Sequence, residues 1–405
     1  MSKKLNIVSF GSLIKELGGN LTTGLSMVMW HLAYNMNKVK NLSVSLVATD
    51  FFQERSNIQG IDVIGWTKKS LVKYMIKNIF HTIKYFFLSL HLFFNYKLKI
   101  ISTFIYLCFF DKVIKREQSD ILHIHGTNWI YFRYIKAATR KKTILTIHGM
   151  NGFDINIRNY KNQKKIEKII TSTKFEQIVF ITSDLQKNWI QQYGELASET
   201  RVILNAYNHN CFYYKEGTKN RNNKIILTTV ATISPLKAQE NIIKALSLLP
   251  EKDRFEYWII GKGAIDYEKR VRKMATLSKA NIFFEGQLTQ SLVAEKLRQA
   301  DYMILTSSSE GFGLVYIESI ACGTKVIVPE NLPIVKENGI LNDVNSIFLK
   351  DSSIESITKC LTDLLQAEEY SIQSVAQSVS HLKWENISEE YYQLIESINN
   401  KHIIN

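Results

Sequence analysis

Short apolar runs rich in β-branched residues recur along the chain and alternate with longer segments that can hold helices. Examples are LNIVSF from Leu5, DILHIHG from Asp120 and TILTIHG from Thr143, and a second series begins with KIILTTVATI at Lys224. This alternation is typical of βαβ units, in which helices connect the strands of a parallel sheet. The sequence therefore predicts an α/β fold built on parallel sheets.

A polar and aromatic stretch from Asn205 to Asn223 separates the two series of strands and shows neither a helical nor a strand period. A chain of 405 residues with 45% hydrophobic content can bury more than one core. We therefore expect two doubly wound, Rossmann-like domains at residues 1–210 and 211–382, followed by a final segment at 383–405.

The charge and cysteine content narrow the classes of partner and compartment. Lys and Arg number 51 against 37 Asp and Glu, a net charge of +14, which favours anionic partners. The lysines form no basic-aromatic motif of a nucleic-acid reading module, so we expect no nucleic acid partner. The four cysteines lack C-x-x-C spacing, which argues against a zinc knuckle or a disulfide framework and favours the cytoplasm. No uninterrupted apolar run reaches about 20 residues, so a membrane-spanning helix is not expected.

The stretch SSSEGFGLVYIESIACGTKVIVPE holds two glutamates around a glycine-rich turn. The pattern predicts a strand that ends near Glu310, a helix with Glu318 in its first turns, and a new strand after Gly323. Ligands of open parallel sheets bind beyond the carboxyl ends of strands, where helix N-termini attract phosphate. On these residues alone, a solvated Glu310 and a Glu318 that only complements the helix dipole remain an alternative.

The whole string resembles the retaining glycosyltransferases of family 4. The resemblance implies that Glu310 contacts the donor sugar and that Glu318 binds the ribose hydroxyls of the nucleotide. It further implies that backbone amides of the turn hold sugar and phosphate oxygens. The residues of this turn are Gly311, Phe312, Gly313, Leu314 and Val315.

The same resemblance implies the GT-B fold, in which two Rossmann-like domains face a central cleft and a C-terminal helix crosses back to the first domain. Near the C-terminus, Trp384, Ile387, Tyr391 and Leu394 share one face of a helical pattern. This shared face independently favours docking of that helix.

VATISPLKAQENIIKAL, which begins at Val230, resembles the family's segment after the first strand of the second domain. The family uses an Arg and a Lys there to neutralise the donor diphosphate. Lys237 occupies the Lys position, whereas Thr232 stands where the Arg is expected. Loss of the guanidinium removes a bidentate phosphate clamp, so weaker donor binding, an unusual donor or lost activity are all open.

The resemblance is looser in the first half of the chain. Gly18 and Gly19 lie where the family places a glycine loop that approaches the donor phosphate, although a simple flexible loop explains them equally well. His148 ends a predicted strand, where family members often carry a histidine close to the donor sugar. His123 and His125 are rivals for this role, and we assign it to His148.

The implied reaction is the transfer of a hexosyl group from a nucleotide diphosphate sugar to a hydroxyl of a glycan or lipid-linked acceptor, in cell-surface polysaccharide synthesis. Catalysis would rest on Glu310, His148 and Lys237, without a metal ion or a cofactor other than the donor, because no D-x-D motif is present. The alternative is a non-catalytic subunit that scaffolds a partner enzyme. Thr232 favours this alternative, whereas the glutamate pair and Lys237 argue against it.

The segment from Thr67 to Phe110 extends beyond the family core and is rich in aromatics and lysines. Lys73, Lys77 and Lys84 contribute to a narrow basic stripe on an otherwise apolar helical pattern. The apolar face either packs on the first domain or lies on an anionic membrane surface. The expected location is therefore the cytoplasm, with peripheral attachment to the inner face of the cell membrane left open.

Overall fold

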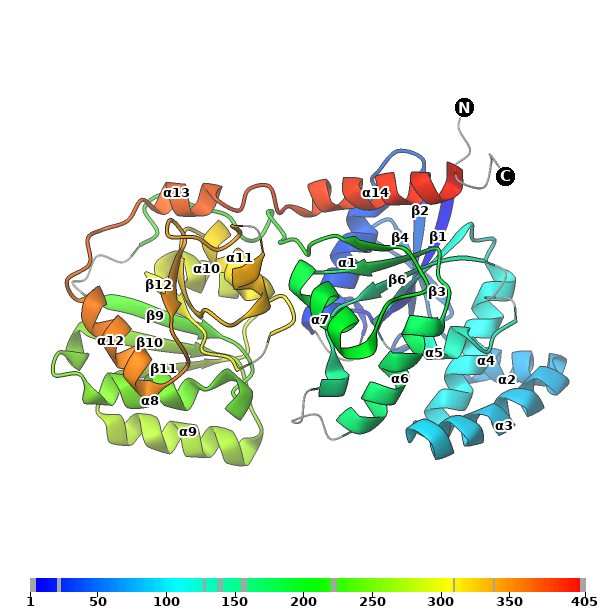
Figure 1. Ribbon diagram of the computed structural model, residues 1–405, viewed down its shortest axis with the longest axis horizontal. Helices are drawn as coiled ribbons and strands as arrows, with labels where there is room; N and C mark the ends of the chain where they lie inside the picture. Colours follow the sequence, from blue (N-terminus) through cyan, green and yellow to red (C-terminus); the bar gives the residue numbers. More distant parts are fainter. Residues whose placement is uncertain are drawn as a thin grey trace. The chain divides into compact units, whose positions relative to one another are not determined.

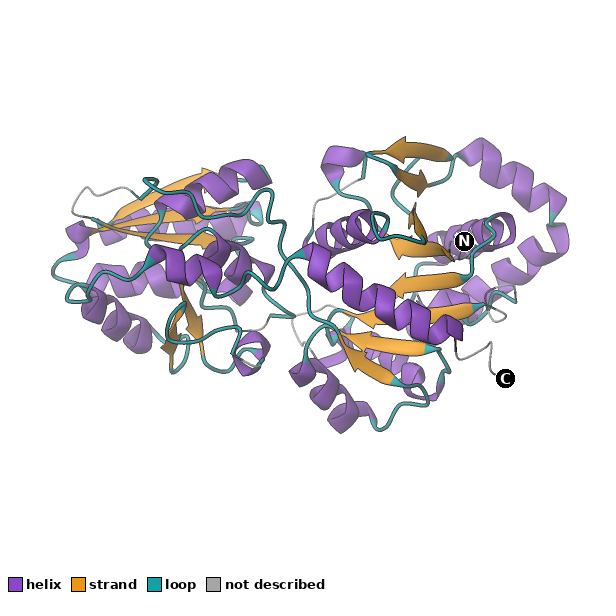
Figure 2. Cartoon of the chain, turned by 90° about the horizontal axis from the view of Figure 1, so that it is seen from above, coloured by secondary structure: helices purple, strands orange, loops and turns teal. Residues whose placement is uncertain are grey.

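The computed structural model describes residues 5–400 except 20–22, 127–128, 137, 139–140, 154–158, 220–223, 309 and 338 (Figure 1). Its contacts divide the chain into two compact units. The first unit contains the residues up to Asn205 and those from Trp384 onward, and the second contains Ala206–Lys383. Both units are α/β, with helices on the two faces of a largely parallel sheet (Figure 2).

The first unit has a sheet that, within the described residues, contains eight strands in the order β3-β4-β2-β1-β5-β6-β7-β8. Neighbouring strands are parallel except β3 and β4, which form an antiparallel hairpin at one edge. The strands are β1 Leu5–Gly11, β2 Leu42–Ala48, β3 Arg55–Ile58, β4 Ile61–Ile64, β5 Ile121–His125, β6 Lys142–Ile147, β7 Gln177–Phe180 and β8 Thr200–Val202.

Helices that connect these strands cover both faces of the sheet, because each parallel pair requires a crossover. They are α1 Gly24–Met36, α2 Lys68–Lys77, α3 Ile79–Tyr96, α4 Ile100–Arg116, α5 Trp129–Phe132, α6 Tyr160–Ser172 and α7 Ser183–Tyr193, with short 3-10 turns at Lys15–Leu17 and Asn151–Phe153. The unit also contains the C-terminal helix α14 Trp384–Asn400.

The second unit has a sheet of six strands in its described part, all parallel, in the order β11-β10-β9-β12-β13-β14. The strands are β9 Ile225–Val230, β10 Phe255–Ile260, β11 Asn281–Gly286, β12 Tyr302–Ile304, β13 Lys325–Pro329 and β14 Ser346–Leu349. The helices are α8 Gln239–Leu248, α9 Ile265–Ser278, α10 Gln290–Gln299, α11 Leu314–Ala321, α12 Ile354–Leu364 and α13 Ile372–Gln377, with 3-10 turns at Pro235–Lys237, Lys252–Arg254 and Pro333–Lys336.

Each sheet is wound in two directions from its first strand. In the first unit β1 lies between β2 and β5, and in the second unit β9 lies between β10 and β12. Such a reversal leaves a crevice beyond the carboxyl ends of the two central strands, where doubly wound proteins bind ligands. The two sheets confirm the predicted fold class and locate one switch point in each unit.

The C-terminal helix α14 belongs to the first unit, as predicted, and packs on α1. Its apolar face is buried at Trp384, Ile387, Tyr391 and Leu394. The Trp384 ring stacks on His31 of α1, with ring centroids 6.2 Å apart. The shared face that the sequence indicated is thus the docking face.

The aromatic segment after Thr67 forms three helices, so our prediction of one continuous helical stripe is wrong. The breaks occur at Asn78, which has φ −120° and ψ 46°, and at Lys97, which is left-handed with φ 55°. A tertiary hydrogen bond accounts for the fold-back: the Tyr74 hydroxyl of α2 donates to Asp111 of α4 at 2.6 Å. Lys115 also donates to this buried carboxylate at 2.8 Å. None of the helices that the structure describes is long and apolar enough to cross a membrane.

Candidate active site

The loop after β9 carries Lys237 and is held by one buried side chain. Gln239, at the start of α8, donates from Nε2 to the Thr232 carbonyl at 3.0 Å and accepts at Oε1 from the Ser234 amide at 3.3 Å. Gln239 is fully buried, so these bonds are shielded from water. The result is a defined loop at the carboxyl end of β9 in which Thr232 is exposed.

The loop after β12 carries Glu310 and is tied to the Lys237 loop by the backbone. The Ser308 amide donates to the Leu236 carbonyl at 3.0 Å, and the Thr306 hydroxyl donates to the Ala238 carbonyl at 3.4 Å. Because β9 and β12 are neighbours at the switch point, their two loops meet at the crevice that the topology predicts.

Lys237 and Glu310 form an ion pair that joins these two loops. Their side chains are 18% and 12% exposed, so the pair is mostly shielded from solvent. The Ser307 hydroxyl donates to the same carboxylate oxygen at 2.7 Å. The structure therefore brings together two of the three predicted catalytic residues and adds Ser307, which the sequence interpretation missed.

Helix α11 begins directly after the Glu310 loop, with Gly313 as its N-cap. Gly313 is left-handed with φ 76°, and a Cβ at this position would lie 2.5 Å from the Tyr316 ring. Glycine is thus required for both its backbone conformation and its close approach to Tyr316. The cap has no side chain, so nothing on it can accept from the amides of Leu314 and Val315. Amides in the first turn of a helix lack intrahelical partners and attract anions.

Two more of the predicted turn residues lie at this end of α11. Gly311 is exposed, and Phe312 is buried with 3% exposure. The buried ring anchors the turn in the protein interior, while the exposed glycine leaves its backbone open to a ligand.

Glu318 lies on the second turn of α11 and is half-buried. Burial raises the pKa of its carboxyl group to about 7. The described residues provide no ion-pair partner for this carboxylate. A carboxylate in such surroundings is stabilised by a ligand that donates hydrogen bonds to it.

In the first unit, Gly19 lies in the loop after β1, at the switch point of that sheet. A Cβ on Gly19 would lie 2.0 Å from the Leu13 carbonyl oxygen, so only glycine fits. The Gly19 amide donates to the Ile14 carbonyl at 3.0 Å. That amide therefore donates within the loop and not to a ligand. The contribution of the loop is that its backbone can lie close to a ligand.

His148 follows β6 and is half-buried. Its Nε2 atom lies 2.9 Å from Nδ1 of His125, the last residue of the neighbouring strand β5. Burial lowers the pKa of His148 to about 4, and burial together with the neighbouring histidines keeps the pKa of His125 well below its usual range. Both rings are therefore neutral at pH 7, and one donates to the other.

A deeper part of the same cluster links these histidines to α14. His123 Nε2 lies 2.8 Å from the Thr146 hydroxyl, which lies 3.3 Å from the Tyr391 hydroxyl. Burial, with a smaller contribution from the nearby His148 ring, lowers the pKa of His123 to about 3. His123 is thus a packed and hydrogen-bonded histidine.

Glu167 of α6 holds the segment after His148. Its carboxylate accepts from the amides of Asn151 at 2.8 Å and Gly152 at 3.0 Å and from the Tyr193 hydroxyl at 2.6 Å. Burial raises the pKa of Glu167. This anchor fixes the path of the chain beyond His148, and no sequence motif pointed to it.

Comparison with known proteins finds a matching family model in each half of the chain. Residues 60–210 match the model described as Glycosyltransferase Family 4, and residues 214–376 match the model described as Glycosyl transferases group 1.

Curated relatives and solved structures agree with these matches. The phosphatidylinositol N-acetylglucosaminyltransferase GPI3 subunit of Saccharomyces cerevisiae is 20% identical over 304 residues, and the match covers 71% of this chain and 65% of the yeast protein, slightly less than two thirds. Sucrose-phosphate synthase from Thermosynechococcus elongatus superposes with a TM-score of 0.76 at 14% identity, over 98% of this chain and 100% of that chain. Anabaena HepE in complex with UDP and glucose superposes with a TM-score of 0.70 at 15% identity, over 97% and 100%. At these identities the solved structures show a shared fold. The chain therefore belongs to the glycosyltransferases, with a family 4 model on its first half, a group 1 model on its second, and the GT-B fold.

Proposed function

We propose that the chain transfers a hexosyl group from a nucleotide diphosphate sugar to a hydroxyl of a glycan or lipid-linked acceptor in cell-surface polysaccharide synthesis. The anomeric configuration is retained, and no metal ion takes part. The observation that carries this proposal is the Lys237–Glu310 ion pair at the switch point of the second sheet, next to the N-terminus of α11. A cation, a carboxylate and helix-terminal amides are the groups that a sugar linked to a diphosphate requires.

In this proposal, Lys237 and the N-terminus of α11 stabilise the negative charge of the leaving nucleoside diphosphate. An ammonium group has three N–H donors, and Glu310 accepts from one of them. The others remain for phosphate oxygens, together with amides from the turn that contains Gly311, Phe312, Gly313, Leu314 and Val315. Fixed donors of this kind stabilise charge that develops in the transition state.

The two glutamates recognise the sugars at either side of the diphosphate. Glu310 accepts hydrogen bonds from hydroxyls of the transferred hexose, and Glu318 accepts them from the ribose. In the first unit, His148 hydrogen-bonds the hexose, and the glycine loop at Gly19 lets the backbone approach a phosphate. Carboxylates suit these tasks because ionised acceptors form stronger hydrogen bonds with hydroxyls.

The named relatives support these assignments in outline. The solved Anabaena protein holds UDP and glucose, which are the parts of a nucleotide sugar. The yeast relative is named for transfer to phosphatidylinositol, a lipid acceptor. The four cysteines of this chain are free, which fits the cytoplasmic location that we propose.

A donor screen tests the proposal. The full chain is incubated with UDP- and GDP-linked hexoses and a panel of glycan and lipid-linked acceptors, and release of nucleoside diphosphate is measured. We expect release with one donor class, unchanged by EDTA, and an NMR coupling in the product that matches the donor anomer. Absence of release with every donor and acceptor would contradict the enzyme function, and an inverted product would contradict retention.

A second candidate function is a non-catalytic glycosyltransferase-like subunit that scaffolds a partner enzyme. The observation that favours it is Thr232, which stands exposed where the family's phosphate-binding Arg is expected. A scaffold would show no turnover in the donor screen, and substitution of Lys237 would leave its partner's activity unchanged.

A further inference from the structure

Helix α3 exposes phenylalanines on the face opposite its packing face. Tyr85, Ser89 and Leu92 are buried against the rest of the first unit. Phe80, Phe87 and Phe94, which we term the α3 aromatic stripe, are 85%, 63% and 69% exposed. They lie seven residues apart, or about two helical turns, and therefore form one line along the helix.

The neighbouring helices α2 and α4 carry further exposed apolar side chains. Val72 and Ile76 on α2 are 52% and 70% exposed, and Ile101 at the start of α4 is 75% exposed. Half of the exposed large hydrophobic side chains among the described residues lie between positions 72 and 101. Isolated exposed apolar side chains are ordinary, whereas a concentration of this kind marks an interaction surface.

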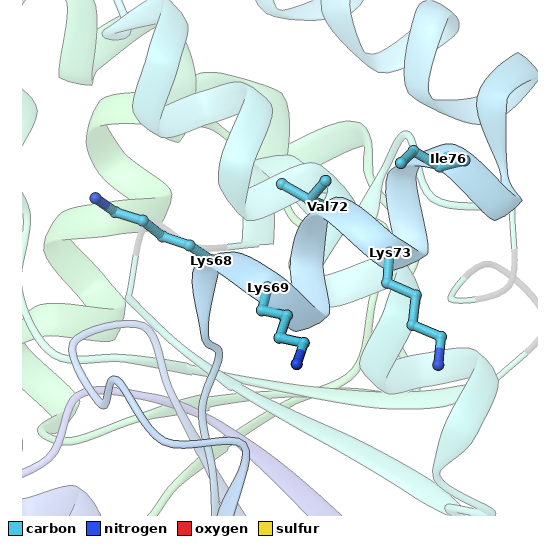
Figure 3. A pocket seen from close by; sticks show the side chains of 5 residues that line it. All are labelled: Lys68, Lys69, Val72, Lys73 and Ile76. Atoms are coloured by element: carbon cyan, nitrogen blue, oxygen red, sulfur yellow. The ribbon is translucent and has the colours of Figure 1, made fainter.

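Lysines accompany the apolar side chains, and acidic residues are absent from this stretch of sequence. Positions 63–110 contain seven lysines and no Asp or Glu. Figure 3 shows an open hollow on α2 in which Val72 and Ile76 lie on one side of the helix, while the ammonium ends of Lys69 and Lys73 extend to the other. A second hollow, where Asn95 and Tyr96 of α3 meet α6, is lined by Lys165 and Lys168.

We propose that α2 and α3 dock on an anionic membrane surface. The α3 aromatic stripe enters the boundary between headgroups and acyl chains, and the lysines of α2 and α3 contact acidic headgroups. Charge complementarity selects this occupant over a second copy of the chain, because two copies would bring like-charged helices together. Docking on a membrane goes beyond the proposed transfer reaction and is tested by a separate measurement. The docking proposal and the transfer proposal can therefore be refuted independently of each other.

Vesicle flotation of the full-length chain tests the docking. Wild type is mixed with vesicles of phosphatidylcholine alone or of phosphatidylcholine with phosphatidylglycerol. We expect flotation with the anionic vesicles, little with the neutral ones, and progressive loss with added salt, because exposed charges are screened. Equal flotation with both vesicles, or none with either, would overturn the proposal.

Two sets of variants separate the apolar and the electrostatic contributions. The combined variant Phe80→Ser, Phe87→Ser and Phe94→Ser alters exposed positions only, so the fold should persist, and thermal unfolding checks this. We expect at least about tenfold weaker binding to anionic vesicles, since each phenylalanine loses apolar burial in the membrane. A matched control with exposed side chains of the second unit consists of Leu248→Ser, Ile265→Ser and Leu277→Ser, which are 65%, 73% and 72% exposed in the wild type.

The lysine variant keeps the apolar face and removes charge: Lys73→Gln, Lys77→Gln and Lys84→Gln. We expect weaker binding to anionic vesicles and a shallower dependence on salt. The matched control is Lys244→Gln, Lys269→Gln and Lys273→Gln, on exposed positions of α8 and α9. Equal losses in the test and control variants would contradict the assigned surface. The proposal would also be overturned if the wild type formed a dimer and bound no vesicles, and if the serine variant alone were monomeric. The α3 aromatic stripe would then be a contact between two copies of the chain.

Discussion

Nδ1 of His125 and Nε2 of His148 lie 2.9 Å apart, at the ends of two neighbouring parallel strands. The other ring nitrogen of His125, Nε2, is buried and has no hydrogen-bond partner among the described residues. A buried N–H without a partner is rarer than a buried acceptor without one. The proton of His125 therefore resides on Nδ1 and is donated to His148, whose own proton resides on Nδ1 and can be donated to a ligand.

This arrangement predicts the tautomer of His148. Nitrogen NMR of the labelled protein near pH 7 should show His148 protonated at Nδ1 and unprotonated at Nε2. His125→Phe keeps an aromatic ring and removes the donor, so we expect kcat to fall about tenfold, the scale of one hydrogen bond, with KM little changed. His125→Asn retains a donor and should restore most of the loss. A His148 ring protonated at Nε2 would contradict the assignment.

Lys237→Ala should abolish measurable transfer while leaving the fold intact. No arginine stands at the expected position, so under the proposed function Lys237 balances the diphosphate charge together with the amides at the start of α11. Nucleoside diphosphate release measures transfer, and thermal unfolding measures the fold. Lys244→Ala, on an exposed position of α8, is the matched control. Near wild-type turnover in Lys237→Ala would show that the phosphates lie elsewhere.

Thr232→Arg should strengthen nucleoside diphosphate binding by roughly tenfold, within the range of a charge-assisted hydrogen bond. The Thr232 side chain is exposed, and its carbonyl is already held by Gln239, so the longer side chain can be accommodated without moving the loop. Calorimetry measures the affinity. Thr232→Met, which adds length without charge, is the control, and equal affinities of the two variants would refute a role for the guanidinium.

Donor binding should strengthen as pH rises through about 7, because burial raises the pKa of Glu318 to about 7 and only the ionised carboxylate accepts from both ribose hydroxyls. An intact nucleotide sugar is the ligand of choice, since its diphosphate does not titrate in this range. We expect about tenfold weaker binding at about pH 6 than at about pH 8. Glu318→Gln should abolish this dependence, and Glu318→Ala should weaken binding by about 1 to 3 kcal/mol. Unchanged affinity in both variants would refute the ribose assignment.

The same pKa shift predicts an effect on stability that does not depend on the ligand. A raised carboxyl pKa contributes stability that is present below the ordinary value and is lost as pH rises through about 7. Glu318→Gln removes the ionisation, so its unfolding midpoint should exceed that of wild type at about pH 8 and approach it at about pH 5. Thermal unfolding of the two proteins at both pH values measures this difference. A midpoint difference that is the same at both values would contradict the shift.

The fold could be predicted because its signals are local and repeated. Strand and helix periods alternate along the chain. The helical spacing of Trp384, Ile387 and Tyr391 is enough to identify the buried face of α14. The breaks at Asn78 and Lys97 could not be predicted, since positions 66–110 contain neither Gly nor Pro. A tertiary contact between Tyr74 and Asp111 closes that fold-back, and sequence periodicity carries no information about it.

The candidate site also contains residues that could be predicted from the sequence and residues that could not. Glu310, Glu318 and Lys237 belong to contiguous motifs, whereas the partners that orient the site come from elsewhere in the chain or from residues without a distinctive pattern. His125 reaches His148 only because β5 and β6 are neighbours in one particular register. Gln239 and Ser307 lie close to predicted residues, yet Gln and Ser are common at helix starts and in loops, so only their hydrogen bonds identify them.

The ion pair between Lys237 and Glu310 has a consequence for turnover under the proposed assignment. A donor offers phosphate oxygens to Lys237 and sugar hydroxyls to Glu310, so it compensates both members of the pair at once. After transfer, the product nucleoside diphosphate still binds Lys237 but offers no hydroxyls of the hexose to Glu310. An unpaired carboxylate that is shielded from water is unfavourable in free energy. Re-formation of the ion pair then competes with the retained phosphates. Under this assignment, the Lys237–Glu310 ion pair favours release of the product nucleotide over release of the intact donor.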